Sequence, residues 1–386
     1  MGYKIPLGKL ILTEEMKKAA LDALENESPV LGESVFKFEE EFARYCGVDY
    51  AVAVSSGTDA LNFCMEALGI RGGEVITTPM SYISSANCII FGGGTPVFAD
   101  IDETGNIDPK EIVKAIGPKT KGILPVHFHG YPCDMDGIME IVEKHNFILV
   151  EDVCHAHGAE YGGKKLGSFG NAGCFSFYPR KNMTVFGDGG MVTTNDEKLA
   201  RTIAKMREHG HTHQEYVHDI MGYTGRLNTI NAAIGRVQLK HLDEWNERRR
   251  QNARLYNHLL ADLEEEGYLR LPPQETEKAK PVYFHYTIHT PRRNELKLWL
   301  ERNGIECDIH YPIPIHLQPL YRRLFNYKEG SYPKSEEFAK TCLSIPMHPL
   351  LTKEEIEFVC EKIREFFEGF FVGGTLIKSL RKRKKR

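Results

Sequence analysis

Hydrophobic and polar residues alternate between two patterns along the first two-thirds of the chain. Amphipathic stretches with helical spacing, such as PKEIVKAIG and MDGIMEIVEKH, separate short apolar runs of strand length. These runs are YAVAVSS (50–56), EVITTP (74–79), TPVFADI (95–101), GILPVHF (122–128), FILVEDV (147–153), CFSFY (174–178) and GMVTT (190–194). Strands that alternate with helices predict an α/β domain with a mostly parallel central sheet.

Two helical patterns frame this region. TEEMKKAALDALEN (13–26) predicts a helix with Thr13 as its N-cap. A much longer pattern over 228–266 contains no proline and only Gly235 as a helix-weakening residue. We interpret this long helix as the connector that leads out of the first domain.

The segment after the long helix has a different character. It starts with the polar, proline-rich loop LPPQETEKAKP and continues with the strand pattern VYFHYTIHT and two helical patterns. This mixture predicts a smaller C-terminal α+β domain. We therefore expect a large domain over residues 1–243, a small domain over 244–370 and a basic tail over 371–386.

Composition and charge narrow the range of functions. The 386 residues contain 49 Lys and Arg against 53 Asp and Glu, a net charge of −4, which argues against nucleic-acid binding. No apolar run approaches the roughly 20 residues of a membrane span. Nine scattered cysteines without a C-x-x-C pair predict no disulfide framework and a cytoplasmic location.

The chain ends in RKRKKR, which we interpret as a solvated tail. The apolar stretch GFFVGGTLI (369–377) precedes these charges, so weak peripheral contact with an anionic membrane is the alternative.

The segment SSGTDAL (55–61) is a candidate phosphate site. It lies where a predicted strand ends and a helix begins, and free N–H groups at a helix N-terminus bind phosphate. Gly57 permits close approach, and Ser56 and Thr58 add hydroxyl groups. Taken alone, the segment is better explained as a simple strand–helix turn with a Ser/Thr cap, since a lone glycine turn is a weak signal.

Two further residues complete a recognisable set. Lys181 follows an apolar strand, where a partly desolvated amine can form a Schiff base with an aldehyde. Asp152 ends another apolar strand, where its carboxylate can pair with a cationic ligand atom. A phosphate cradle, a Schiff-base lysine and a carboxylate for the ring nitrogen are what pyridoxal 5'-phosphate (PLP) requires.

At this point the chain resembles the DegT family of PLP-dependent sugar aminotransferases, which have the fold type I architecture. The resemblance covers about residues 5–368. The matching segments come in the family's order: SSGTDAL, TTPMSYISSAN, TPVFADID, PVHFHGYPCDMD, EDVCHAHGAEYGGKKLGSFG, CFSFYPRKN, GDGGMVTTND, GYTGRLNTINAAIGRVQL and IHYPIPIHLQP.

The resemblance implies roles for individual residues. Lys181 would hold PLP as a Schiff base and move protons, and Asp152 would pair with the pyridinium nitrogen. His155 would lie near the phenolic oxygen of the ring, and Tyr82 would stack on the pyridine face. Residues that would bind the phosphate are Gly57, Thr58 and Ser176.

The loop GYTGR departs from the family pattern. Relatives often have Asn where this chain has Thr224, and that Asn reaches the cofactor phosphate of the partner subunit. Thr224 is shorter, so Asn228 or Asn231 could substitute for it. The resemblance thus implies a homodimer in which Thr224 and Asn228 contribute to the cofactor site.

The segment IHYPIPIH corresponds to the sugar-binding side of the family, which makes His310, Tyr311 and His316 candidate substrate-binding residues. The expected reaction is transamination of a keto-sugar, nucleotide-linked, with L-glutamate as donor. A sugar dehydratase is an alternative, but relatives of that kind have His in place of Lys181. A regulatory DegT-like protein is another alternative.

A metal enzyme is the rival from a different class. His127 and His129 lie on one face of a predicted strand, and Asp152, Cys154, His155 and His157 follow the next. A second histidine tract covers 209–218. Because none of these spacings is a known zinc signature, we expect no metal site.

Overall fold

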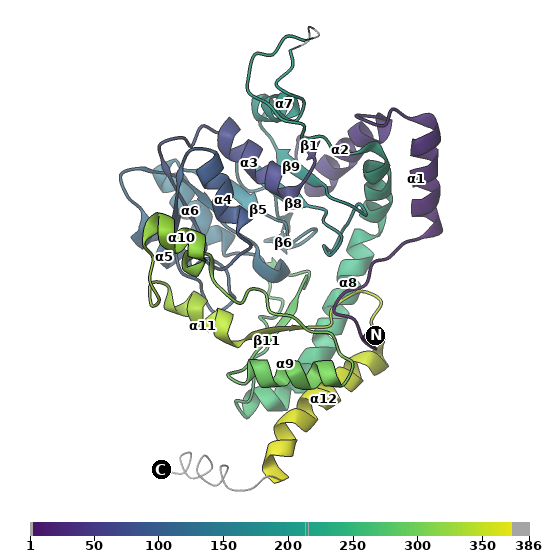
Figure 1. Cartoon of the computed structure of the whole chain (residues 1–386), viewed down its shortest axis with the longest axis vertical. Helices are drawn as coiled ribbons and strands as arrows, with labels where there is room; N and C mark the ends of the chain where they lie inside the picture. Colours follow the sequence, from purple (N-terminus) through teal and green to yellow (C-terminus); the bar gives the residue numbers. More distant parts are fainter. Residues whose placement is uncertain (1–2, 213, 215, 373–386) are drawn as a thin grey trace.

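A seven-stranded sheet organises the first two-thirds of the chain in the computed structural model, which describes residues 3–212, 214 and 216–372 (Figure 1). Its strands in spatial order are β1 (Tyr50–Val54), β9 (Gly190–Thr194), β8 (Ala172–Ser176), β5 (Ile148–Asp152), β4 (Thr120–Leu124), β2 (Glu74–Thr77) and β3 (Thr95–Phe98). The strands from β8 to β3 pair in parallel, whereas β9 is antiparallel to both of its neighbours. The predicted α/β fold with a mostly parallel sheet is confirmed.

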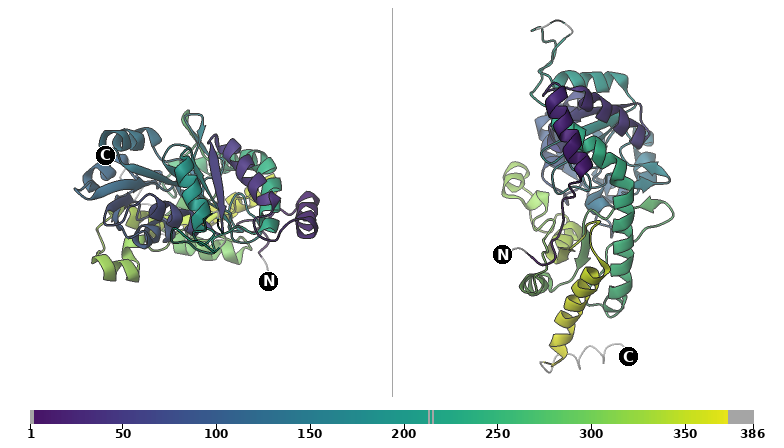
Figure 2. Two further views of the ribbon diagram at one scale, coloured as in Figure 1. Left: turned by 90° about the horizontal axis from the view of Figure 1, so that it is seen from above. Right: turned by 90° about the vertical axis from the view of Figure 1, so that its right-hand side faces the viewer.

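Helices cover both faces of this sheet (Figures 1 and 2). One layer contains α2 (Glu33–Cys46), α5 (Pro109–Ala115), α6 (Met135–His145) and the first half of α8 (Thr229–Glu265). The other contains α3 (Gly57–Ala67), α4 (Ser84–Phe91) and α7 (Glu197–Met206). Within β1, Ala51 and Ala53 pack into the first layer and Val52 and Val54 into the second. Because both faces of such a strand are buried, its sequence is a continuous apolar run instead of an alternation of apolar and polar residues.

The chain enters the fold through α1 (Glu14–Asn26), which packs beside α8. Thr13 caps α1, because its side chain accepts a hydrogen bond from the N–H of Met16 at 3.2 Å. Met16 is buried against Ile234 and Trp245 of α8. The predicted helix and its cap are confirmed.

The last third of the described chain forms a smaller α+β unit around β11 (Tyr286–His289) and β12 (Cys342–Ile345), which are antiparallel. Its helices are α9 (Arg293–Arg302), α10 (Pro319–Phe325), α11 (Pro333–Thr341) and α12 (Lys353–Val372). A separate small sheet combines β10 (Ala279–Lys280), β6 (Glu160–Tyr161) and β7 (Lys164–Lys165).

Helix α8 runs without a break from the large unit into the small one (Figure 2). Its second half contributes Tyr256 and Leu260 to the core of the small unit, and Ile5 joins the same core from the start of the chain. The expected domain boundary after residue 243 falls inside α8 and stays a prediction. The predicted basic tail lies, from residue 373 onward, outside the described residues.

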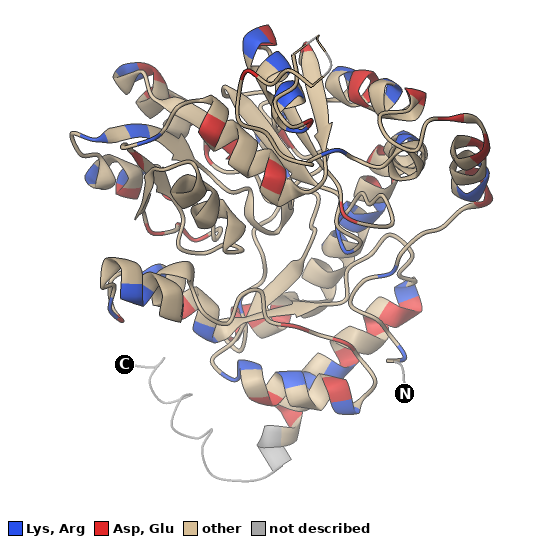
Figure 3. Cartoon of the chain, turned by 45° about the horizontal axis from the view of Figure 1, so that its top comes forward, with Lys and Arg blue, Asp and Glu red and all other residues tan. Residues whose placement is uncertain are grey.

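The distribution of charged side chains agrees with the near-balance of basic and acidic residues in the sequence. Figure 3 shows Lys and Arg interspersed with Asp and Glu along the helices of the face in view. All nine cysteines are free thiols, as expected. In the part of the chain that the structure describes, no helix is both long enough and apolar enough to cross a bilayer.

Candidate active site

A cleft of about 950 Å³ opens at the carboxyl edge of the sheet, between the large unit, the small unit and the N-terminal segment 6–11. Parallel α/β sheets bind ligands at this edge. The structure brings nine of the sequence-predicted residues to the cleft wall: Gly57, Thr58, Tyr82, Asp152, His155, Ser176, Lys181, His310 and Tyr311.

Lys181 lies in the loop that joins β8 to β9, and its backbone N–H donates to the carbonyl of Tyr178 at 2.8 Å. Its Nζ lies 5.0 Å from the centroid of the Phe284 ring. Burial lowers the pKa of Lys181, and the nearby Cys154 and Asp152 only partly oppose this effect. The amine is therefore more often neutral than an exposed lysine, as a nucleophile requires.

Asp152 ends β5 and is buried at the cleft wall. One carboxylate oxygen accepts a hydrogen bond from Ser85 Oγ at 2.7 Å, and the other accepts from the N–H of Cys154 at 3.1 Å. Ser85 is in turn 2.8 Å from Ser81 Oγ. These contacts fix the orientation of the carboxylate and leave it able to accept a further donor from the cleft.

The N-terminus of α3 packs closely against Ser176. Ser56 caps the helix by accepting from the N–H of Asp59 at 3.1 Å. A Cβ atom on Gly57 would lie 2.5 Å from the Cβ of Ser176, so only glycine fits there. Thr58 adds a hydroxyl group, 3.0 Å from Ser84 Oγ. Free N–H groups, hydroxyl groups and the positive end of the helix dipole form an anion cradle.

His155 and Tyr82 lie on the cleft wall in different environments. The His155 ring is buried 4.7 Å from the Phe284 ring centroid, and its Nδ1 has no partner among the described residues. Burial and the neighbouring Lys181 hold the pKa of His155 well below its usual range, so the ring is neutral. Tyr82 is 58% exposed, and its ring centroid lies 6.0 Å from that of Tyr311.

The small unit supplies His310 and Tyr311. His310 stacks on His285 at 3.9 Å between centroids, and its Nδ1 lies 3.0 Å from Ser344 Oγ. Burial lowers the pKa of His310 to about 4. Burial also raises the pKa of Tyr311, with Asp152 adding to the effect. Both side chains therefore offer the cleft uncharged hydrogen-bonding groups.

Three predicted site residues lie away from the cleft of this chain. Thr224 is 3.1 Å from His209 Nε2 on the surface, and Asn228 caps α8 by accepting from the N–H of Ile230 at 3.1 Å. His316 is buried in the small unit, 3.1 Å from Glu336. The structure does not bring His316 to the substrate side, and the roles of Thr224 and Asn228 toward a partner subunit stay predictions.

The histidines that suggested a metal enzyme have other surroundings. Buried His127 lies 3.2 Å from Glu151 and 3.1 Å from the N–H of Cys133. His129 lies 3.1 Å from the carbonyl oxygen of His310. Over residues 3–212, 214 and 216–372, no three His, Cys, Asp or Glu side chains are grouped as metal ligands.

The cleft fits the cofactor that the resemblance implies. A side chain at position 57 would clash with Ser176 and Cys154, so glycine lets the N-terminus of α3 pack directly against Ser176 at the cleft wall. Lys181 and Asp152 supply the amine and the carboxylate. The unpartnered Nδ1 of His155 offers a hydrogen-bonding position. Together these groups match the phosphate, aldehyde, ring nitrogen and phenolic oxygen of PLP.

Several cleft residues were not singled out from the sequence. Ser85 orients Asp152, Phe284 packs against Lys181, and Arg249 lies on the wall contributed by α8. Each comes from an element far along the chain from its partner. Only the motif TTPMSYISSAN, which contains Ser85, gave a signal, through the family resemblance.

The chain is similar to known proteins over nearly its whole length. Residues 11–364 match the model of the DegT/DnrJ/EryC1/StrS aminotransferase family. A pleiotropic regulatory protein of Geobacillus stearothermophilus is 40% identical over 361 residues, 93% of this chain and 96% of that protein. The dTDP-3-amino-3,4,6-trideoxy-alpha-D-glucose transaminase of Streptomyces venezuelae is 39% identical over 372 residues, 95% and 97% of the two chains.

A solved structure is equally similar. The crystal structure of DesV from S. venezuelae in complex with a ketimine intermediate superposes with a TM-score of 0.90 at 39% identity. The match covers 95% of this chain and 99% of DesV.

Proposed function

The chain belongs to the DegT/DnrJ/EryC1/StrS aminotransferase family, and we propose that its substrates are a keto-sugar linked to a nucleoside diphosphate and L-glutamate as amino donor. It is a PLP-dependent aminotransferase that acts on a nucleotide-linked sugar. The observation that carries the proposal is the convergence of Lys181, Asp152 and Gly57 on one large cleft.

The size of the cleft supports a substrate larger than an amino acid. Its volume of about 950 Å³ is at the upper end of small-molecule sites, which commonly have roughly 300–1,000 Å³. The cofactor groups occupy the sheet edge, while Tyr82, His310 and Tyr311 line a wall with rings and polar atoms. Such a wall suits a sugar, whose ring faces pack on aromatic groups and whose hydroxyl groups need uncharged partners.

The residues of the cleft divide the chemistry among them. PLP, when bound, supplies the electron sink that makes the α-proton of an amino acid acidic. Lys181 Nζ would accept that proton and return it, since burial keeps part of the amine neutral. The Asp152 carboxylate, held by Ser85 and Cys154, would keep the ring nitrogen protonated. The N-terminus of α3 at Gly57 would hold the phosphate.

A substrate screen tests the proposal. The purified protein is incubated with glutamate and a panel of dTDP- and UDP-linked keto-sugars, and mass spectrometry detects the amino-sugar product and 2-oxoglutarate. We expect one of these sugars to gain an amino group at the expense of glutamate. Turnover of free keto-sugars alone, or of none of the panel, would contradict the proposed substrate.

Other assignments remain proposals. We propose a homodimer that shares its cofactor sites on the family resemblance, and a cytoplasmic location on the nine scattered cysteines. A regulatory function has support in the name of the Geobacillus relative, a pleiotropic regulatory protein. A dehydratase has less support, because Lys181 occupies the cleft. Amination of a sugar nucleotide by the purified protein in this screen would favour an enzymatic function over a purely regulatory one.

A further inference from the structure

Arg249 is a buried cation on the α8 wall of the cleft, and its residue exposure is 6%. Its Nη1 donates to the carbonyl oxygens of Tyr283 and Met347, at 3.3 and 3.0 Å. Among the described residues, its buried Nε has no acceptor, its hydrogen bonds run through Nη1 and not Nη2, and burial is the sole influence on its pKa, with no carboxylate as a charged partner. Three of its five N–H hydrogens are therefore uncommitted.

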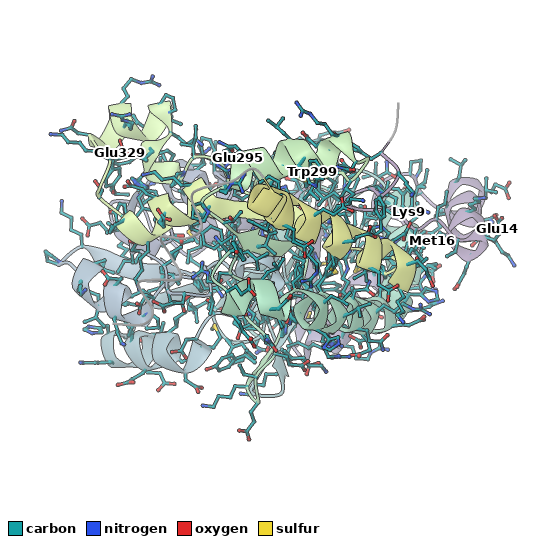
Figure 4. All side chains as sticks on the ribbon, turned by 90° about the horizontal axis from the view of Figure 1, so that it is seen from below. Lys9, Glu14, Met16, Glu295, Trp299 and Glu329 are labelled. Carbon is teal, nitrogen blue, oxygen red and sulfur yellow. The ribbon has the colours of Figure 1, made fainter. Side chains whose placement is uncertain are left out.

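Two more basic groups lie beside Arg249. His348 is 2% exposed, and neither of its ring nitrogens has a partner among the described residues. Burial, together with the positive charges of Arg249 and Lys9, lowers the pKa of His348 to about 4. Lys9 lines the cleft from the N-terminal segment that leads to α1, where Figure 4 labels it. Glu306 also lines the cleft, but its carboxylate accepts from the N–H of Leu7 at 2.8 Å.

This basic group lies near the reacting amine. Asn182, which follows Lys181, donates to Asn246 Oδ1 at 3.2 Å, and Arg249 is three residues further along α8. Three residues of helix rise about 4.5 Å. On the other side, the Tyr283 carbonyl that Arg249 contacts precedes Phe284, whose ring lies 5.0 Å from Lys181 Nζ. Arg249 thus stands about one helical turn from the surroundings of Lys181.

We propose that Arg249, assisted by Lys9, binds a carboxylate of the amino donor. The uncommitted donors on Nε and Nη2 share one edge of the planar guanidinium, and such an edge matches the two oxygens of a carboxylate. A carboxylate ends a molecule and can enter a buried position, whereas a diphosphate must continue into a nucleoside. The inference rests on the proposed transamination and assigns its donor subsite.

The test compares Arg249→Gln and Arg249→Lys with a matched control, Arg250→Gln. Arg250 is equally buried on the same helix but bonds to Glu247 and the carbonyl of Pro281, away from the cleft wall. The probes are glutarate, which has both carboxylates of glutamate and no amine, and a keto-sugar nucleotide. Calorimetry gives the Kd of glutarate with the PLP-loaded enzyme, and kinetics give KM for glutamate and for the sugar nucleotide.

We expect Arg249→Gln to raise the Kd of glutarate and the KM of glutamate by roughly 30-fold or more, the size of a lost charge-assisted contact. Arg249→Lys should fall between this variant and the wild type. The KM of the sugar nucleotide should change by less than about 3-fold, and Arg250→Gln should leave all three values near wild type.

Two outcomes would overturn the assignment. A rise in the KM of the sugar nucleotide with unchanged glutarate binding would show that Arg249 binds the diphosphate. Equal, small effects of the Arg249 and Arg250 variants, with similar loss of thermal stability, would show a purely structural role. If the wild type binds glutarate but aminates no nucleotide-linked sugar, the proposed substrate fails and the glutarate comparison still decides the role of Arg249.

Discussion

Lys181 combines a buried amine, a lowered pKa and a place in the cleft beside Asp152. We predict that Lys181→Ala abolishes transamination, because no other described lysine shares these properties at the sheet edge. Borohydride reduction of the loaded wild type, followed by peptide mapping, should find the pyridoxyl label on Lys181. Lys164 and Lys205 are surface lysines, and Lys205 pairs with Asp219 at 2.8 Å. A label on either of them would overturn the assignment.

The charge of Asp152 is predicted to matter more than its hydrogen bonds. Asp152→Asn keeps the shape that Ser85 and Cys154 hold in place but removes the negative charge that we propose pairs with the ring nitrogen. We expect PLP to remain bound while kcat falls by orders of magnitude, as measured by absorbance titration and steady-state kinetics. The same substitution also removes a negative charge that partly offsets the lowering of the Lys181 pKa by burial.

The matched control for this prediction is Ser85→Ala. It removes the 2.7 Å hydrogen bond to Asp152 and leaves the carboxylate charged. Its kcat should fall by roughly 10-fold at most, the cost of one hydrogen bond of about 1 kcal/mol. Near-normal turnover of Asp152→Asn would show that Asp152 is not the partner of the ring nitrogen.

At the residue scale, the sequence predicts groups whose chemistry shows in local motifs. Lys181, Asp152 and Gly57 each stand next to a strand end, where the apolar pattern stops, and all three reach the cleft. Arg249 and Phe284 carry no local signal. Arg249 lies in a run of three arginines on a long helix, and only the packing of α8 against distant segments distinguishes it from Arg250.

At the scale of elements, His316 has a clear partner in α11. Its Nε2 lies 3.1 Å from Glu336, whose carboxylate also accepts from the N–H groups of Gly330 and Tyr332. Burial would raise the pKa of Glu336, but these donors outweigh it and lower the pKa below the ordinary value of 4.5. The resulting stabilisation is present above pH 4.5 and is lost as the pH falls through the lower folded-state pKa.

We therefore predict that Glu336→Gln lowers the free energy of unfolding by about 1–3 kcal/mol at pH 7, the range for hydrogen bonds to a charged group. The difference from wild type should shrink as the pH falls below 4.5 and through the lower folded-state pKa of Glu336, where the wild-type carboxylate takes up its proton. Urea unfolding at several pH values measures this difference in the free energy of unfolding. Glu329→Gln is the control, since exposed Glu329 (Figure 4) forms an ion pair with Lys340 alone among the described residues, at 3.5 Å. A pH-independent difference for Glu336→Gln would contradict the prediction.

The sequence predicts which helices and strands exist better than it predicts where they begin and end or in which direction a strand runs. The predicted strand 122–128 is observed as β4 (Thr120–Leu124), and Pro125, which has no N–H to donate, follows directly. The antiparallel direction of β9 has no local signature, because its residues GMVTT resemble those of a parallel strand. Helix α2 (Glu33–Cys46) was not predicted, although its apolar side is buried against the sheet.

At the scale of the whole molecule, the loop between α7 and α8 extends beyond the large unit at the end opposite the small unit (Figure 1). Tyr216 and Met221 in this loop are 81% and 79% exposed. The same region carries Thr224, which is exposed and distant from the cleft of its own chain. A second copy of the chain would cover such apolar side chains and could receive Thr224 at its phosphate cradle.

We predict a homodimer in which each cofactor site needs residues of both chains. Its expected symmetry is C₂, the commonest symmetry of oligomers. The test mixes Lys181→Ala chains with chains that carry Thr224→Ala, Arg226→Ala and Asn228→Ser, each inactive alone. Serine is chosen at position 228 because Asn228 caps α8, and serine preserves a cap. In a mixed dimer, one of the two sites has an intact lysine and an intact partner loop. Random mixing in equal amounts should therefore recover about a quarter of wild-type activity, because half of the dimers are mixed. A fully active monomer in light scattering, or no recovery when mass spectrometry proves the mixing, would show that the site is not shared.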